Sequence, residues 1–297
     1  MPQDYCHHLT KKNPEVSQFG SNGQQDASEW LMFLFEQLHS ETNLKCNVMG
    51  GPSSSQTGPA LQAALDFWQE HCKFNESIID KYFRGIEATI TTCRVCRNVS
   101  TRMEQTLIFN LVLNGSDSTL TEHLDGATRA EDVSGYQCDK CERLQPASKM
   151  TRFARLPEVL VVMLVRYDFK DRGMTKNTTR VTFDVDSQSF ESVFLDPDQR
   201  GLRAGQALPE DDNGFGQEFR YRCFGVVMHS GESPYHGHYY SYLRDLRGGG
   251  RESTWWRCND AKVNEMDSGF NVMEACKKDA RRAPGAEPFL LFFKRKM

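Results

Sequence analysis

Two pairs of cysteines with C-x-x-C spacing are the clearest candidates for chemistry in this 297-residue sequence. Cys93 and Cys96 form the first pair and Cys138 and Cys141 the second, with 41 residues between the pairs. One C-x-x-C turn places two thiolates side by side, so two turns complete a tetrahedron around Zn²⁺ and leave no open position. Four unligated core thiols would rarely show this spacing twice. The four cysteines therefore predict one structural zinc ion.

A histidine and an asparagine form a second candidate. His238 lies where a glycine-flanked loop leads into a tyrosine-rich strand, and Asn259 lies at the end of the next predicted strand. The two residues are equally far from the centre of the glycine-rich turn at 246–251, so an antiparallel hairpin would place them opposite each other. Opposed residues have Cβ atoms roughly 4.5–5.5 Å apart. We therefore expect the Asn259 amide oxygen to accept a hydrogen bond from one imidazole nitrogen.

Such a pair would be the base half of a Cys-His-Asn arrangement. The amide fixes the tautomer of the imidazole, and the other ring nitrogen takes the proton of a thiol to produce a thiolate nucleophile. Spacing alone leaves a second interpretation open, in which His238 packs in a sheet and Asn259 caps a turn. His229 and His236 are rival bases. His236 shares a face with His238 but lies nearer the glycine-flanked loop, so we prefer His238.

Helical periodicity predicts two helices in the first quarter of the chain. The first covers residues 26–39, with Asp26 and Glu29 in the positions of a capping box. The second is expected over residues 60–72, after a Gly-, Ser- and Pro-rich insertion at 49–59. The apolar face of the first helix consists of Ala27, Trp30, Leu31, Leu34 and Leu38.

Strand patterns dominate the rest of the chain. Alternation with a period of two begins at residue 82, and another strand-like run covers 106–113, so the cysteines belong to a β-rich module. Residues 156–167 are almost continuously apolar, which is typical of a strand buried on both faces. Residues 184–217 are acidic and aperiodic, which indicates a long surface loop or a partly disordered insertion. The pattern indicates an α+β fold, with further strands at 219–228, 238–244, 254–258 and 288–294.

Composition excludes some classes of function. The formal net charge of -4 and the pI near 6.1 disfavour general nucleic-acid binding, because phosphate-binding domains are normally basic. The N-terminus has no apolar signal segment and no run of 18 apolar residues occurs, so we expect neither secretion nor a membrane partner. A zinc site beside free thiols suits a reducing compartment. We therefore expect a cytoplasmic or nuclear protein.

Five segments, in order, resemble the motifs of the ubiquitin-specific proteases. They are 24–30 with Gln24-Gln25-Asp26, the two C-x-x-C pairs, 156–167, Gly237-His238-Tyr239 and 256–263 with Asn259-Asp260. This resemblance, over nearly the whole chain, implies the hand-like α+β fold of a family in the papain-like cysteine protease superfamily. It implies one domain over residues 1–297, with a partial helical thumb at 1–80, zinc-bearing β fingers at 81–150 and a β-sheet palm at 151–297.

The resemblance also implies roles for individual residues. His238 corresponds to the general base, Asn259 to the residue that orients it and Asp260 to an adjacent acid. Ubiquitin or ubiquitinated proteins are the implied partners, and the residues implied to contact ubiquitin are Gln25, Asp26 and Tyr239. Asp26 would bind an arginine of the ubiquitin tail. A helix cap is its other expected role, and both can hold.

The nucleophile of the family is a cysteine in a Gly-Asn-Thr-Cys-type box, which this sequence does not contain. Cys6 is the only cysteine before Gln24, and its surroundings lack the box. One interpretation is a deubiquitinase that hydrolyses the bond after the C-terminal glycine of ubiquitin and whose nucleophile segment is absent from this chain. The alternative is a non-catalytic ubiquitin-binding pseudoprotease. The presence of His238 and Asn259 favours the first, and we expect this chain alone to be inactive.

Overall fold

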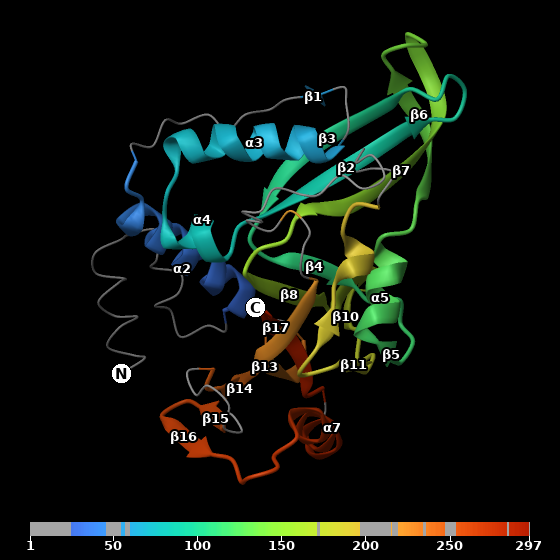
Figure 1. Cartoon of the computed structure of the whole chain (residues 1–297). Coiled ribbons are helices and arrows are strands. Elements are labelled where there is room, and N and C mark those ends of the chain that lie inside the picture. The colour runs from blue at the N-terminus through green and yellow to red at the C-terminus, as the bar shows by residue number, and fades with distance from the viewer. Residues whose placement is uncertain are drawn as a thin grey trace.

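Two large β-sheets with helices packed against them form the centre of the protein (Figure 1). The structure, a computed structural model, describes residues 25–45, 55–56, 60–170, 173–196, 215, 219–233, 236–246, 254–283 and 285–296. Cys6, most of the insertion expected at 49–59 and the centre of the turn expected at 246–251 lie outside the described residues. No helix in the described ranges has both the length and the apolar character needed to cross a membrane.

The larger sheet has eight strands in the order β16-β15-β14-β13-β17-β8-β4, and β12 pairs with β13 beside this path. Neighbouring strands are antiparallel except β4 and β8, which are parallel. Their bounds are Phe109–Val112 (β4), Val159–Val165 (β8), Gln188–Ser189 (β12), Arg220–Ser233 (β13), His236–Arg244 (β14), Trp255–Asn259 (β15), Lys262–Glu265 (β16) and Glu287–Arg295 (β17).

The smaller sheet carries the cysteine pairs. Its strand order is β1-β3-β2-β7-β6. Cys93 ends β2 and Cys138 ends β6, so both C-x-x-C turns lie at ends of its strands. Ile86, Ala88 and Ile90 alternate as buried residues along β2, which confirms the period-two prediction there. The bounds are Ser55–Gln56 (β1), Gly85–Cys93 (β2), Val99–Thr106 (β3), Glu131–Cys138 (β6) and Arg143–Arg155 (β7).

The remaining elements are helices and short strand pairs. The helices are α2 (Ala27–Thr42), α3 (Ala60–Phe74), α4 (Ile78–Tyr82), α5 (Leu120–Ala127) and α7 (Val272–Arg282), with a 3-10 turn η2 (Glu191–Val193). Two small sheets pair β9 (Tyr167–Lys170) with β10 (Gly173–Lys176) and β5 (Ser118–Thr119) with β11 (Val181–Thr182). The two helices predicted from periodicity are thus present as α2 and α3, whereas α4, α5 and α7 were not predicted.

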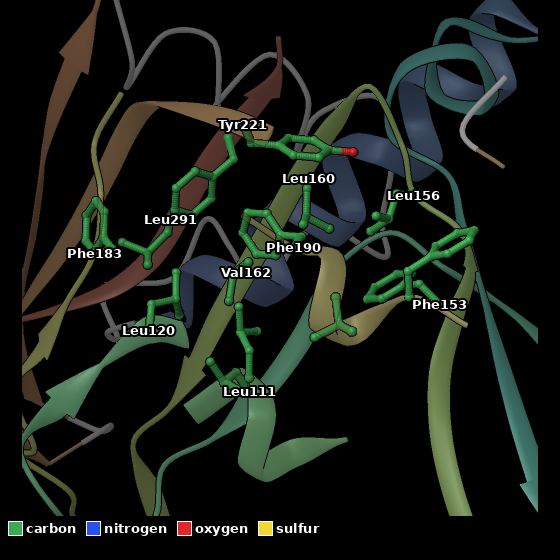
Figure 2. Packing of buried hydrophobic residues seen from close by; sticks show 14 of the residues in the cluster. Leu111, Leu120, Phe153, Leu156, Leu160, Val162, Phe183, Phe190, Tyr221 and Leu291 are labelled. Carbon is green, nitrogen blue, oxygen red and sulfur yellow. The ribbon is translucent and has the colours of Figure 1, made fainter. Parts of the chain in front are cut away.

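Strand β8 is buried on both faces, as predicted. Val162 and Leu164 belong to the main core, while Val161 belongs to a second, smaller cluster. Phe35 of α2 lies in that second cluster, so α2 covers one face of the sheet. Figure 2 shows the main core, where Phe190 packs among Leu160, Val162 and Tyr221. Side chains on both faces of β8 therefore contact apolar residues, which explains the nearly continuous apolar run.

The prediction of a surface loop over 184–217 was wrong for its first part. Residues 188–189 form β12 and residues 191–193 form η2, and Phe190, Val193, Phe194 and Leu195 are buried. Four large apolar side chains in six residues remove enough nonpolar surface from water to hold an irregular segment against the sheet. The acidic residues around them stay at the surface. Residues 197–214 of the predicted loop lie outside the described residues.

The buried face of α2 also differs from the predicted one. Phe35 is its buried residue, and Ala27, Leu31, Met32 and Leu38 pack around it. Trp30 and Leu34 are only half-buried, although they were assigned to the apolar face. The helix has apolar residues on more than one side, so periodicity alone could not choose the face that meets the sheet.

Candidate active site and metal site

Strands β14 and β15 bring His238 and Asn259 together. The predicted register was wrong by two residues, because Ser241 pairs with Cys258 and Tyr242 with Arg257. An even shift keeps every side chain on the same face of a strand. His238 and Asn259 therefore remain on one face and meet across a diagonal instead of directly. The prediction that their side chains touch is confirmed even though their direct opposition is not.

A two-residue turn after β15 sets the position of the asparagine. Asn259 pairs with Lys262 of β16, so Asp260 and Ala261 form the turn. Asp260 has φ of 53°, a left-handed conformation that aspartate and asparagine tolerate better than most residues. The turn places Asn259 at the end of its strand and Asp260 directly beside it. Both side chains can thus reach the same imidazole.

The imidazole of His238 is hydrogen-bonded through one nitrogen. Its Nε2 lies 2.5 Å from Oδ1 of Asn259 and 3.8 Å from Oδ2 of Asp260. Because the amide oxygen only accepts, Nε2 carries the proton and donates it, which leaves Nδ1 unprotonated. The His238 side chain is 45% exposed. An oriented, accessible imidazole with a free nitrogen can act as a general base.

Helix α7 packs against the face of β14 that carries His238. The carboxylate of Asp279 accepts hydrogen bonds from Tyr240 Oη at 2.9 Å and from Tyr242 Oη at 2.7 Å. The Tyr240 ring stacks beside that of His238, with centroids 6.3 Å apart, and the Arg257 guanidinium lies over the Tyr240 ring, 4.7 Å from its centre. This anchoring role of Asp279 was not predicted. An Asn271 cap before an amphipathic stretch was the sequence feature that could have revealed α7.

The rival histidines differ in accessibility. His229 is fully buried, and burial followed by the charge of Lys176 lowers its pKa to about 4. It is therefore neutral and shielded from substrate. His236 is exposed and pairs with Ser233 at the start of β14. The imidazole that lies within hydrogen-bond distance of the Asn259 amide is that of His238.

The residues expected to contact ubiquitin lie around the start of α2. Asp26 is the N-cap of α2, with Oδ1 accepting from the backbone amide of Ser28 at 2.7 Å, and Gln25 precedes it. Tyr239 points to the opposite face of β14 from His238 and packs against the His229 ring at 4.7 Å. Burial, then the negative charge of Asp26, raises the pKa of Tyr239 above its ordinary range. Gln25, Asp26 and Tyr239 therefore occupy one region.

A groove of about 690 Å³ starts beside this region. It runs between α2 and the segment that joins β3 to β4, and Met163 of β8 also lines it. The acidic residues Glu29 and Glu36 of α2 lie along the groove. Such a groove suits an extended segment that carries positive charge.

The four cysteines converge at the end of the smaller sheet. Their sulfur atoms all lie within 4.8 Å of one another, and no other group of three or more candidate ligands occurs within the described residues. Arg97 and Glu142, the residues that follow the two turns, have φ of 60° and 54°, and their amides donate to the carbonyls of Cys93 and Cys138. The two turns therefore share one conformation.

The cysteine cluster has the donor set of a metal site. The backbone amide of Cys96 donates to the Cys93 sulfur and is the main cause that lowers the Cys93 pKa, to about 7. A thiolate held by backbone amides is a ready metal ligand. The cluster could hold one metal ion in tetrahedral coordination, with no position left for substrate.

The fold and the site together define an α+β protein with a four-cysteine finger and a histidine that is oriented by an asparagine. The protein-family profile described as "Ubiquitin carboxyl-terminal hydrolase" matches residues 1–293. The chain therefore belongs to the ubiquitin carboxyl-terminal hydrolase family. Its fold is the α+β fold of the ubiquitin-specific proteases.

Curated relatives carry names from the same family. The chain is 28% identical over 214 residues to mouse ubiquitin carboxyl-terminal hydrolase 24, covering 67% of this chain and 8% of the relative. It is 26% identical over 274 residues to ubiquitin carboxyl-terminal hydrolase 4 of Saccharomyces cerevisiae, covering 84% of this chain and 28% of the relative. The chain thus spans less than a third of the length of these relatives.

Solved structures show the same fold at lower identity. The structure of the SAGA Ubp8/Sgf11/Sus1/Sgf73 DUB module bound to ubiquitin aldehyde matches with a TM-score of 0.67 and 21% identity, covering 98% of this chain and 53% of that chain. A SAGA DUB module bound to monoubiquitin matches with a TM-score of 0.65 and 22% identity, covering 97% and 51%.

Proposed function

We propose that this chain forms the thumb, finger and palm parts of a deubiquitinase that cleaves after the C-terminal glycine of ubiquitin. His238 is the general base, Asn259 orients its ring and Asp260 adds a nearby negative charge. The observation that carries the proposal is the 2.5 Å contact between His238 and Asn259 in a member of this family. The thumb, fingers and palm are assigned to residues 1–80, 81–150 and 151–297.

In the proposed reaction, Nδ1 of His238 removes the proton of a cysteine thiol. The thiolate attacks the carbonyl of the terminal glycine of ubiquitin, the bond to the leaving amine breaks, and the imidazolium protonates that amine. Water then attacks the thioester, with His238 again taking the proton, and the product acid and the free thiol are released. Among the described residues, Asn259, Asp260 and Tyr240 are the neighbours recorded for the His238 ring. The proposed nucleophile is a cysteine outside the described residues.

Ubiquitin is the proposed partner. The acidic groove beside Asp26 and along Glu29 and Glu36 suits a basic, extended tail. Structures with this fold have been solved with ubiquitin aldehyde and with monoubiquitin. Gln25, Asp26 and Tyr239 are the proposed contacts at one end of the groove. Zn²⁺ is the proposed metal of the four cysteines, because their thiolates match its preference for tetrahedral sulfur ligands.

Cleavage of a fluorogenic ubiquitin substrate tests the proposal. The chain is assayed alone and joined to any coding sequence found upstream of Met1. We expect turnover only in the extended protein, and we expect His238→Ala to lower kcat by on the order of 10⁴-fold. His236→Ala, two residues away on the same strand and exposed, is the matched control and should keep the activity.

Ubiquitin titration separates the proposal from its alternative. Chemical-shift changes in the groove without turnover in any form would favour a non-catalytic ubiquitin-binding module. Equal loss of activity in His236→Ala and His238→Ala would contradict the assignment of the base. Absence of both turnover and binding would reject the function as a whole.

A further inference from the structure

A half-buried ammonium group holds the backbone next to the proposed base. Nζ of Lys176, at the end of β10, lies 2.6 Å from the carbonyl oxygen of Gly285, 2.8 Å from that of Gly231 and 3.2 Å from that of His229. It also lies 2.8 Å from Nδ1 of His229. Two of the carbonyls come from the end of β13, and the third comes from the segment that leads into β17. One cation therefore joins three elements of the palm.

The backbone around this ammonium is built for close approach. Gly231 has φ of 146° and Gly285 has φ of 70°, and a Cβ on Gly285 would lie 2.5 Å from the Gly231 carbonyl oxygen. Only glycine fits such a contact. Partial negative charges of several carbonyls converge there, and a group with three N–H donors and a positive charge offsets their repulsion. A neutral side chain of the same length could not.

The segment that Lys176 holds, residues 229–231, pairs with the start of β14, the strand that carries His238. Ser230 pairs with His238 in the β13–β14 ladder, between the two carbonyls of His229 and Gly231 that Lys176 binds. Gly237 packs directly on the His229 ring, since a Cβ there would lie 2.5 Å from Nε2 of His229. Movement of residues 229–231 would therefore move residues 237 and 238.

We propose that Lys176 is a positioning residue for His238: its ammonium fixes the end of β13 and, through Gly237, the placement of the His238 ring. This inference rests on the proposed function of His238. Lys176 itself does not touch substrate. It acts on the rate by holding the imidazole within hydrogen-bond reach of Asn259.

The surroundings of Lys176 make its charge sensitive to pH. Burial, then the nearby Arg166, lowers the pKa of Lys176 to about 8, while Glu287 opposes this shift. Nδ1 of the neutral His229 accepts from Lys176 and lies 3.0 Å from Tyr167 Oη, and Tyr167 has its pKa raised to about 12, mainly by burial. Lys176 therefore loses its charge as the pH rises through about 8, and its hold on the carbonyls weakens there.

Two variants of Lys176 and one control test the proposal. Lys176→Met keeps the length of the side chain and removes the charge, whereas Lys176→Arg keeps a charge that does not titrate below pH 12. Thr175→Met, an exposed neighbour on β10, controls for disturbance of the hairpin. The first readout is the ring ¹⁵N spectrum of His238 in the 297-residue chain. It requires no turnover, so it stands even if the proposed deubiquitinase activity fails.

In the parent chain and in Thr175→Met we expect one tautomer, protonated at Nε2, and a change in the His238 signals with a midpoint near pH 8. Lys176→Met should average the two tautomers at pH 7, and Lys176→Arg should abolish the pH 8 transition. In the active form, Lys176→Met should lower kcat on the order of 10- to 100-fold with little effect on KM, as a displaced catalytic group does.

Two results would overturn the proposal. One is a folded Lys176→Met chain whose His238 ring signals match the parent. The other is a transition of the His238 signals near pH 8 that persists unchanged in Lys176→Arg. This second result tests the proposal even if Lys176→Met does not fold.

Discussion

Replacing Glu87 by glutamine should stabilise the protein at neutral pH and not at acidic pH. Glu87 lies on β2 directly opposite Glu104 of β3, so two carboxylates face each other across the sheet. Burial, and then the charge of Glu104, raises the pKa of Glu87 to about 6, although a hydrogen bond with Thr106 acts in the other direction. Glutamine has nearly the same shape and no charge to bury.

The size of the effect follows from the shift in pKa. The value of about 6 in the folded state lies above the ordinary value of 4.5, so the folded state binds the proton more tightly than the unfolded state. The contribution of Glu87 to the free energy of unfolding is then fully present below pH 4.5. It is lost as the pH rises through 6, which lowers the free energy of unfolding by roughly 2 kcal/mol for a shift of this size. The glutamine variant escapes this loss.

Urea unfolding at pH 4.5 and at pH 7.5 measures the free energy of unfolding of both proteins. We expect Glu87→Gln to be more stable than the parent by roughly 2 kcal/mol at pH 7.5 and about equal to it at pH 4.5. Glu131→Gln, on an exposed position of β6, should be the same as the parent at both. A gain from Glu87→Gln that is equal at both pH values would refute the electrostatic origin, and a loss at pH 7.5 would refute the whole account.

Two further predictions concern the cysteine cluster and the buried Asp80. Metal analysis should find one zinc per chain, and Cys93→Ser combined with Cys138→Ser should reduce it to zero, whereas unchanged zinc would reject the site. Asp80 is buried, and its carboxylate accepts a hydrogen bond from His71 at 2.9 Å. Asp80→Ala should lower the free energy of unfolding, measured with urea, by about 3–5 kcal/mol. Asp66→Asn, at an exposed position, is the control and should leave it unchanged. An Asp80→Ala cost no larger than the control's would show that its hydrogen bonds contribute little.

Local patterns were enough to predict the elements whose burial repeats regularly. Ile86, Ala88 and Ile90 alternate along β2, and the apolar run in β8 is covered on both faces. In both strands the side-chain pattern and the burial pattern arise from the same geometry, so one can be inferred from the other. Asp26 is similar, because capping depends on residues only two or three positions away.

Features that depend on distant contacts were missed. The β14–β15 register differs by two residues from a turn centred on the glycines, because the ladder is also held by β13 and β16 on either side. Helix α7 is strongly polar, and only its contact with Tyr240 and Tyr242 shows what Asp279 does. Lys176 lies 53 residues before His229 in the sequence, so no local motif links the two.

Contacts from three sides fix the position of His238. Its contact with Asn259 was therefore predicted correctly even though the predicted register was wrong. The turn at Asp260 presents Asn259, Asp279 of α7 holds Tyr240 on the same face, and Lys176 holds the end of β13 beneath Gly237. Since side chains alternate with a period of two, any register that moves by an even number keeps this face and only slides the partner along it. An odd shift would turn Asn259 away from the ring and leave Cys258 in its place. The spacing of His238 and Asn259 therefore predicts that the two side chains share a face, and it does not predict which residue lies directly opposite.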